Sequence, residues 1–227
     1  MSDATDFLYP FIEGDETDSA TLLVDLSRSA REKWGESGQL RERTLSGSAE
    51  EIRVIAAAMA ERFAAGGRLF AFGNGGSATD ADGVAQLYTQ PPAPPARPLA
   101  ARSLVEDHAV ITALGNDIGF DNVFSRQLIA HGHEGDIAMG FSTSGNSENL
   151  IMAFTEAKRR GMLTVGLSGY EGGRMAAAPS VDHCLVARSQ SVHRIQEAQA
   201  SLTHALWEAV QAAVDDLGEL SEAPASA

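Results

Sequence analysis

The sequence predicts an α/β fold in which helices flank a parallel sheet of five strands. Five short apolar runs are spread along the chain, and stretches with helical apolar spacing lie between them. Strands that alternate with helices are typical of parallel sheets with right-handed crossovers. The chain has 227 residues, of which 44% are hydrophobic, and this is enough to build the core of one such domain.

The first part of the chain is predicted to be helical after a flexible start. Residues 1–16 show no clear pattern, and we expect them to be flexible. Residues 20–36 and 48–65 carry apolar side chains at helical spacing, which predicts two N-terminal helices. The second helix is expected to end at "AAGG", residues 64–67, because glycine commonly terminates helices.

The rest of the chain alternates between the two periods. The predicted strands are 68–73, 98–104, 136–142, 162–168 and 182–187. The helices predicted between them are 77–90, 108–115, 121–131 and 147–160. A last amphipathic helix is predicted over 191–217, and residues 218–227 are expected to fray. The pattern indicates a single domain over residues 17–217.

The composition excludes several classes of partner. The chain has 17 basic and 31 acidic residues, a formal net charge of -14. Such a surface repels nucleic-acid phosphates and anionic lipids, so we expect no nucleic-acid and no membrane partner. No apolar run approaches the ~20 residues of a membrane helix, and the first residues lack a signal-peptide pattern, which predicts a cytoplasmic protein. The one cysteine, Cys184, is expected to be a buried small hydrophobe.

Two small polar loops follow predicted strands. "GNGGS" (73–77) follows the first strand, and "STSGNS" (142–147) follows the third. Ligands of open α/β sheets bind beyond the carboxyl ends of the strands. A helix is expected to begin near Ser147, so hydroxyls, backbone N–H groups and a helix dipole meet at one place. This combination, without lysine, suits a phosphate monoester. An ordinary helix cap in a serine-rich turn is the alternative for either loop alone.

The two loops, in this order, resemble those of the SIS family of phosphosugar-binding domains. Within that family the closest likeness is to the phosphoheptose isomerases, which act on sedoheptulose 7-phosphate. The likeness covers about residues 47–215. Besides "GNGGS", it is carried by "GNDIGFDNVFSRQL" (115–128), "GDIAMGFSTSGNSENLI" (135–151), "GYEGGRM" (169–175) and "RIQEAQ" (194–199). The resemblance implies a flavodoxin-like three-layer sandwich, assembled as a homotetramer with sites between subunits.

The resemblance also implies a binding site for a phosphorylated sugar. It assigns the phosphate to Ser77, Ser142, Thr143, Ser144 and Ser147. It places Asn74 on the sugar, and Asp117 and Gln196 in the pocket. Asp117 has an equally good interpretation as a turn residue, because Asn-Asp before Gly119 favours a turn.

The sequence departs from the family at the catalytic side chains. An aldose–ketose isomerase needs a base for the proton beside the carbonyl and an acid that returns a proton. The isomerases carry His-x-x-x-Glu after the glycine loop, and a Gln and a His eight residues apart in the last helix. Some members hold zinc with these four side chains. Here Gly83 and Leu87 stand in place of the first pair, whereas Gln196 and His204 match the second.

Other groups must therefore supply the chemistry if the chain is an enzyme. His204 is the expected acid/base partner, and Asp80, Asp82 or Glu197 is the expected base. Asp80 matches the family pattern, so it is not a replacement that is special to this chain. Leucine cannot ligate zinc, and two protein ligands are too few for a zinc site, so we expect no metal and no other cofactor.

Two hypotheses of different classes remain open at this point. The first is an isomerase of a sugar phosphate such as sedoheptulose 7-phosphate, with an atypical acid/base pair. The second is a catalytically silent SIS domain that senses a phosphosugar or acts as an adaptor for a partner protein. The retained Gln196 and His204 favour the first, and Gly83 and Leu87 favour the second.

Overall fold

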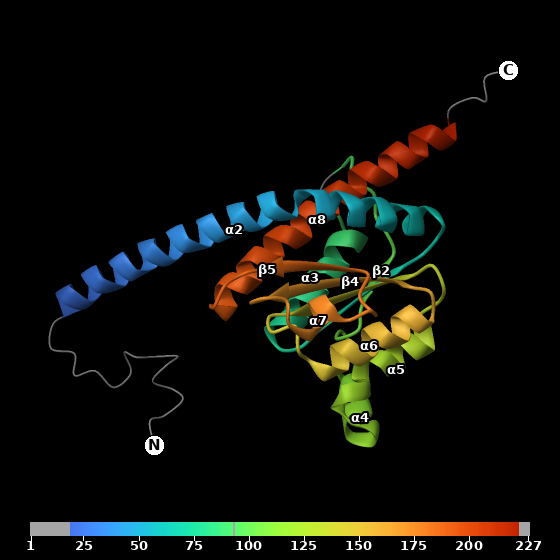
Figure 1. Cartoon of the computed structure of the whole chain (residues 1–227), viewed down its shortest axis with the longest axis horizontal. Helices are drawn as coiled ribbons and strands as arrows, with labels where there is room; N and C mark the ends of the chain where they lie inside the picture. The colour runs from blue at the N-terminus through green and yellow to red at the C-terminus, as the bar shows by residue number, and fades with distance from the viewer. Residues whose placement is uncertain (1–18, 93, 223–227) are drawn as a thin grey trace. The chain divides into compact units, whose positions relative to one another are not determined.

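The computed structural model describes residues 19–92 and 94–222 (Figure 1). The segment 1–16, expected to be flexible, and residues 223–227 of the expected frayed tail lie outside the described residues. The helices are α2 (Ser19–Ala64), α3 (Gly76–Thr89), α4 (His108–Ile118), the 3-10 turn η1 (Phe120–Asn122), α5 (Val123–His131), α6 (Glu148–Arg159), α7 (Gly173–Ala177) and α8 (Val192–Glu222).

The predicted parallel sheet of five strands is confirmed. The strands are β1 (Leu69–Gly73), β2 (Ala101–Ser103), β3 (Ile137–Ser142), β4 (Leu163–Gly169) and β5 (His183–Ala187). Their order is β2-β1-β3-β4-β5, and every pair is parallel. All residues of β1, β3 and β4 are buried, as expected for strands covered on both faces. Gly73 at the end of β1 pairs with Phe141 in β3, so the loops after these two strands leave the sheet side by side.

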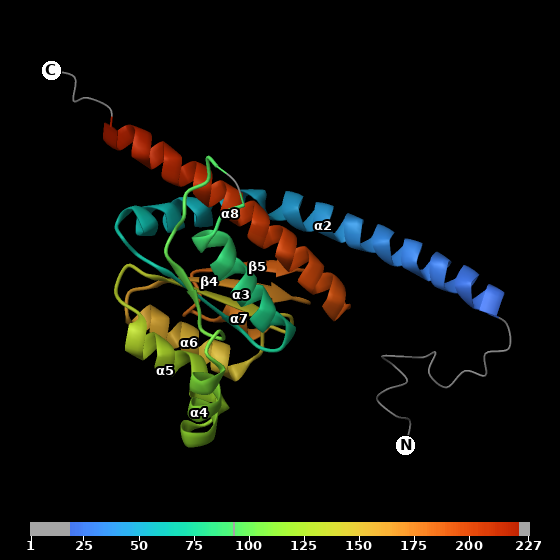
Figure 2. The same ribbon diagram turned by 180° about the vertical axis from the view of Figure 1, so that it is seen from behind.

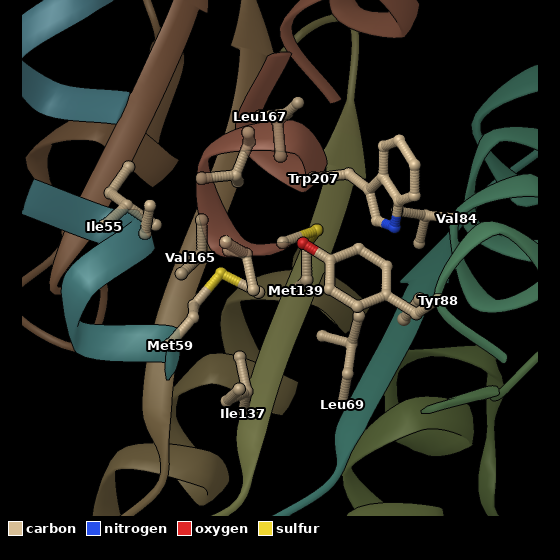
Figure 3. Packing of buried hydrophobic residues seen from close by; sticks show 14 of the residues in the cluster. Ile55, Met59, Leu69, Val84, Tyr88, Ile137, Met139, Val165, Leu167 and Trp207 are labelled. Carbon is tan, nitrogen blue, oxygen red and sulfur yellow. The ribbon is translucent and has the colours of Figure 1, made fainter. Parts of the chain in front are cut away.

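Helices cover both faces of the sheet (Figures 1 and 2). On one face, α3, α8 and the last turns of α2 enclose the larger apolar cluster. On the other face, α5, α6 and α7 enclose a second cluster that contains four phenylalanines, Phe70, Phe72, Phe124 and Phe154. Figure 3 shows the larger cluster, in which side chains from the three helices meet those of the strands; the labelled residues are Ile55, Met59, Val84, Tyr88, Trp207, Leu69, Ile137, Met139, Val165 and Leu167.

The structure corrects the predicted ends of the helices. The two helices expected at 20–36 and 48–65 form one continuous helix, α2. Interior glycines destabilise a helix by only about 1 kcal/mol each, so Gly35, Gly38 and Gly47 do not end it. The last helix extends to Glu222 and so includes the first residues of the tail that was expected to fray.

The chain divides into two units by its internal contacts, and the boundary falls between Gln39 and Leu40. The described part of the first unit is the beginning of α2, where Leu23, Val24 and Trp34 are exposed. The second unit contains the whole sheet and the other helices. No helix within the two described ranges is both long and apolar enough to cross a membrane.

Candidate functional site

The first loop is a tight turn between β1 and α3. A Cβ atom on Gly73 would lie 2.3 Å from the carbonyl oxygen of Ser77, so the chain can close this turn only with glycine there. Gly75 has a φ of 58°, a conformation that side chains disfavour. The Ser77 N–H donates to the carbonyl of Asn74 at 3.0 Å, and Ser77 is buried in the first turn of α3. The loop thus brings Asn74 and Ser77 to the N-terminus of a helix, where anions are stabilised.

The second loop gathers three serine hydroxyls. The Oγ of Ser142 lies 3.5 Å from that of Ser144 and 3.4 Å from that of Ser147, and it accepts the Gly145 N–H at 3.0 Å. Ser147 is the N-cap of α6, as expected, but its side chain makes no capping hydrogen bond. Its hydroxyl is therefore available to a ligand. Hydroxyl donors at a helix N-terminus form a suitable cradle for a phosphate group.

A third segment, which includes α7, packs against the second loop and is hydrogen-bonded to it. Gly145 has a φ of 66°, and a Cβ atom there would lie 2.1 Å from the carbonyl oxygen of Gly172. The Met175 N–H donates to the Gly145 carbonyl at 2.8 Å, and the Arg174 N–H donates to Asn146 Oδ1 at 2.9 Å. The helix α7 was not predicted, because its five residues are too few to show a period.

A pair of asparagines joins the two loops. Asn74 donates to Asn149 Oδ1 at 2.9 Å, and Asn149 donates in return to Asn74 Oδ1 at 3.0 Å. Asn149 lies in the first turn of α6 and is only 3% exposed. Sequence reasoning missed this residue. The available signal was a polar side chain on the face of an amphipathic helix that packs against the core of the protein.

Asp80 lies one turn after Ser77 and faces α8. It is half-buried, and it is hydrogen-bonded to the Gln196 side chain. Burial raises the pKa of the Asp80 carboxyl, and the Gln196 hydrogen bond opposes this in part. Its Oδ2 atom is buried and has no hydrogen-bond partner among the described residues. A carboxylate with a raised pKa and an unused oxygen beside a phosphate cradle can accept a proton.

Gln196 is fixed against the first loop. A Cβ atom at Gly76 would lie only 2.3 Å from Gln196 Nε2, so the amide rests on the backbone at the start of α3. Asn74, Ser77, Asp80 and Gln196 therefore form one continuous group.

The structure places His204 and Glu197 in a different position. Both line an open groove of about 580 Å³ between α2 and α8, together with Arg41, Leu45, Ala200, Ser201, Ala205 and Glu208. The His204 ring packs against Trp207 with 5.4 Å between the ring centroids, and its Nε2 lies 3.5 Å from Glu208 Oε1. Within the described part of the chain, no hydrogen bond joins His204 to Asp80.

Asp117 is also separate from the phosphate loops. It lies near the end of α4, a helix in which no residue is buried. Among the described residues, its carboxylate accepts a hydrogen bond only from Asn116, at 2.9 Å. Ile118 and Phe120 beside it are 41% and 54% exposed. Thr143, in contrast, lies in the second loop beside Ser142 and Ser144, and it is half-buried.

The residues present do not fit the zinc ion that some relatives of this fold are expected to hold. Gly83 has no side chain, and a Cβ atom there would meet nothing within 4 Å. Leu87 packs against the larger apolar cluster. The described residues contain no group of three or more His, Cys, Asp or Glu side chains that could hold a metal ion. We therefore derive no catalytic step through a metal.

Replacing Ser144 with alanine is expected to weaken phosphate binding by about tenfold or more, because one hydrogen bond to a charged group is lost. Calorimetry with a sugar phosphate measures the change. Ser46→Ala is the control, because this hydroxyl is exposed on α2 and bonds only to its own helix. Equal affinity of the Ser144→Ala variant and the unmodified protein would remove this hydroxyl from the site.

Comparisons with known proteins show the family of the chain. A family model described as SIS domain matches residues 35–169. A phosphoheptose isomerase of Nitratidesulfovibrio vulgaris (strain Miyazaki F) is 38% identical over 190 residues, which cover 84% of this chain and 88% of the relative. A phosphoheptose isomerase of Burkholderia pseudomallei is 41% identical over 153 residues, 67% of this chain and 77% of the relative. The structure of phosphoheptose isomerase from Neisseria gonorrhoeae superposes with a TM-score of 0.76 at 35% identity, covering 82% of this chain and 99% of that one.

Proposed function

Because the chain belongs to the SIS domain family, and within it to the relatives of the phosphoheptose isomerases, we propose that it interconverts a ketose phosphate and an aldose phosphate. Sedoheptulose 7-phosphate is the proposed substrate. The observation that carries the proposal is the Asp80 carboxylate, with its buried unpartnered oxygen, one helical turn from a loop that can cradle a phosphate.

We assign the roles as follows. The hydroxyls of Ser142, Ser144 and Ser147, with Ser77 and Thr143 beside them, hold the phosphate. Asn74 and Gln196 orient the sugar. Asp80 removes the proton from the carbon next to the carbonyl, and the resulting enediol receives a proton on the neighbouring carbon, so that the carbonyl moves by one position.

His204 and Glu197 are proposed to transfer protons at the oxygen atoms of the substrate. Since both lie in the groove between α2 and α8, we propose that the site is completed between subunits. The apolar side chains of α4, none of them buried, support contact with a second copy of the chain, and Asp117 would then line the pocket of that copy.

The assembly is expected to be a tetramer. The exposed apolar residues on α4 and at the start of α2 give each chain two faces that a second copy can cover. Multi-angle light scattering at micromolar concentration measures the mass directly. A monomer of 23.9 kDa would contradict the assembly and every role that depends on a shared site.

Activity is expected to be independent of zinc. Catalytic zinc sites use three protein ligands, and Gly83 and Leu87 cannot supply the missing ones. Protein purified without added metal should contain well below one zinc ion per chain by elemental analysis, and a chelator should not change its turnover of sedoheptulose 7-phosphate. Stoichiometric zinc would show that other side chains, such as His193 or those of a neighbouring subunit, complete a site.

The alternative function is a binding module that recognises a phosphosugar without converting it. The packing of Leu87 into the apolar cluster favours this alternative, because a carboxylate is absent from the family's catalytic position. Calorimetry and a turnover assay on the same preparation separate the two. Binding with no conversion over hours at high enzyme concentration would support the module and contradict the isomerase.

A further inference from the structure

An open cavity of about 250 Å³ lies between α2 and the end of β5. The residues that line it are Leu40, Arg43, Thr44, Gly47 and Ser48 of α2, Val186 of β5, and Arg188 directly after β5. The residues of α2 in this set recur every three or four positions, so they share one face of the helix. β5 is an edge strand, and β4 separates it from β3. Because neighbouring strands are about 4.8 Å apart, the end of β5 is ~10 Å from the strand that carries the second loop.

Two arginine side chains line this cavity. Arg43 has no ion pair and no side-chain hydrogen bond with any other described residue. Arg188 pairs with Glu171 through its Nε atom alone, at 3.3 Å; both side chains are exposed, and such a pair contributes little to stability. The described residues that line the cavity include no acidic side chain. Two guanidinium groups at one cavity repel each other, and an anion between them would remove this repulsion.

Two hydroxyl groups at the cavity are also without partners. Thr44 is only 8% exposed, yet its hydroxyl makes no hydrogen bond with the described residues. The usual arrangement in this protein is different, since Thr112 and Thr155 each bond back to a carbonyl oxygen of the preceding helical turn. Ser48 is half-buried, and its hydroxyl likewise has no partner in the described part of the chain. A buried polar group without a partner is uncommon, and both hydroxyls can donate to a ligand.

We propose that this cavity, the arginine pocket, is a second anion site that binds inorganic phosphate or the phosphoryl group of a small metabolite. Guanidinium and hydroxyl donors together suit phosphate, which offers more acceptor oxygens than a carboxylate does. The volume is below the ~300–1,000 Å³ of pockets that hold drug-sized ligands, which also favours a small anion. The pocket shares no residue with the proposed phosphate cradle, so it is independent of the proposed isomerase activity.

The test is calorimetry with inorganic phosphate on full-length protein that carries Ser144→Ala and Ser147→Ala. These replacements weaken the proposed cradle, so the remaining binding reports the arginine pocket. The ionic strength is held constant, because salt screens exposed charges. We expect one phosphate ion to bind per chain. Glycerol 3-phosphate in a parallel titration distinguishes the two sources of phosphate, since tighter binding than that of inorganic phosphate identifies an ester and weaker binding the free ion. Absence of binding of both compounds at millimolar concentration would overturn the inference.

Gly47→Leu, added to this protein, fills the pocket without weakening the fold. A Cβ atom at Gly47 would meet nothing within 4 Å, and replacing an interior glycine stabilises a helix. Tm should therefore rise, while the affinity for phosphate falls by about 100-fold or more because the contacts with both arginines are lost.

Gly35→Leu is the matched control. Gly35 is another exposed interior glycine of α2 with nothing within 4 Å of its Cβ position, and it does not line the cavity. This variant should raise Tm and keep the affinity for phosphate. Equal affinity of the Gly47→Leu and Gly35→Leu variants would contradict the pocket.

Thr44→Val tests the buried hydroxyl as a donor. Valine keeps the shape of the side chain, and the hydroxyl has no partner to lose, so Tm should not fall. The affinity for phosphate should fall by about tenfold. A lower Tm with unchanged affinity would show that the hydroxyl serves the fold and would contradict its role as a donor.

The two anion sites are separated by kinetics. Gly47→Leu in the otherwise unmodified chain should leave KM for sedoheptulose 7-phosphate unchanged. A raised KM would place the sugar phosphate in the arginine pocket and overturn the assignment of a second site. Because the phosphate titrations need no turnover, they test the pocket even if the proposed isomerase activity fails.

Discussion

Replacing Asp80 with asparagine is expected to lower kcat by about 10²–10⁴-fold, because a general base contributes an acceleration of that size. Asparagine keeps the shape of the side chain and can still accept the hydrogen bond from Gln196, so KM should change little. Steady-state kinetics with sedoheptulose 7-phosphate measure both values. A reduction of less than about tenfold in kcat would show that Asp80 is not the base.

Asp82→Asn is the control for this experiment. Asp82 is exposed on the same helix, two residues later, and is one of the two other candidates for the base, with Glu197, that the sequence offers. Its replacement should leave kcat unchanged. A large loss with Asp82→Asn and none with Asp80→Asn would transfer the role of base to the exposed carboxylate.

The Asp80→Asn variant is expected to be more stable than the unmodified protein at neutral pH. Burial raises the pKa of Asp80 above its ordinary value of 3.8, so the folded state binds the proton more tightly than the unfolded state. Between 3.8 and the raised pKa the unfolded state gives up its proton first, and stability falls as the pH rises. Thermal unfolding should give a higher Tm for Asp80→Asn than for the unmodified protein at pH 7. The difference in Tm should shrink as the pH is lowered toward 4.

The second large effect is expected from Gly145→Ala. The new Cβ atom would lie 2.1 Å from the Gly172 carbonyl oxygen, which is backbone and cannot turn aside, and the φ of 66° is itself unfavourable for alanine. Together the overlap and the strain should destabilise the fold by about 2–5 kcal/mol. Because Ser142 and Ser144 move with the loop, phosphate binding should fall by about 100-fold or more.

Gly66→Ala is the matched control for the strain alone. Gly66 follows α2 with a φ of 86°, and a Cβ atom there would meet nothing within 4 Å. Its replacement should cost about 1–2 kcal/mol of stability and leave phosphate binding intact. Chemical unfolding and calorimetry on both variants give the comparison. Equal destabilisation of the two variants would contradict the close packing of the second loop on Gly172.

Much of the fold could be predicted because periodicity reports which faces are buried. The fully buried strands β1, β3 and β4 read as continuous apolar runs, and the helix α6 begins directly after Ser147 as its polar loop indicates. The continuity of α2 could not be predicted, because glycines in its interior look the same in a sequence as glycines that end a helix.

The site was predictable at the loops and less so at the catalytic side chains. The hydroxyls of the second loop are neighbours in the chain, so their meeting follows from a single turn. Asn149 bonds to Asn74, 75 positions away, and Gln199 bonds to Ser142, 57 positions away. No local pattern in the sequence predicts either contact. His204 and Asp80 were expected in one site, but within one chain His204 lines the groove between α2 and α8, whereas Asp80 bonds to Gln196. Which side chains of α8 face α3 depends on the rotation of α8 about its axis, and residue spacing in the sequence does not determine this.

The most direct test of the central claim, that Asp80 is the base of a sugar-phosphate isomerase, is proton exchange followed by NMR. The protein is incubated with sedoheptulose 7-phosphate in D₂O with a chelator present. The account predicts conversion to an aldose phosphate with deuterium on the carbon that was the carbonyl carbon of the ketose, and loss of both signals in Asp80→Asn while phosphate binding remains. Bound substrate that shows neither conversion nor exchange with the unmodified protein would contradict it.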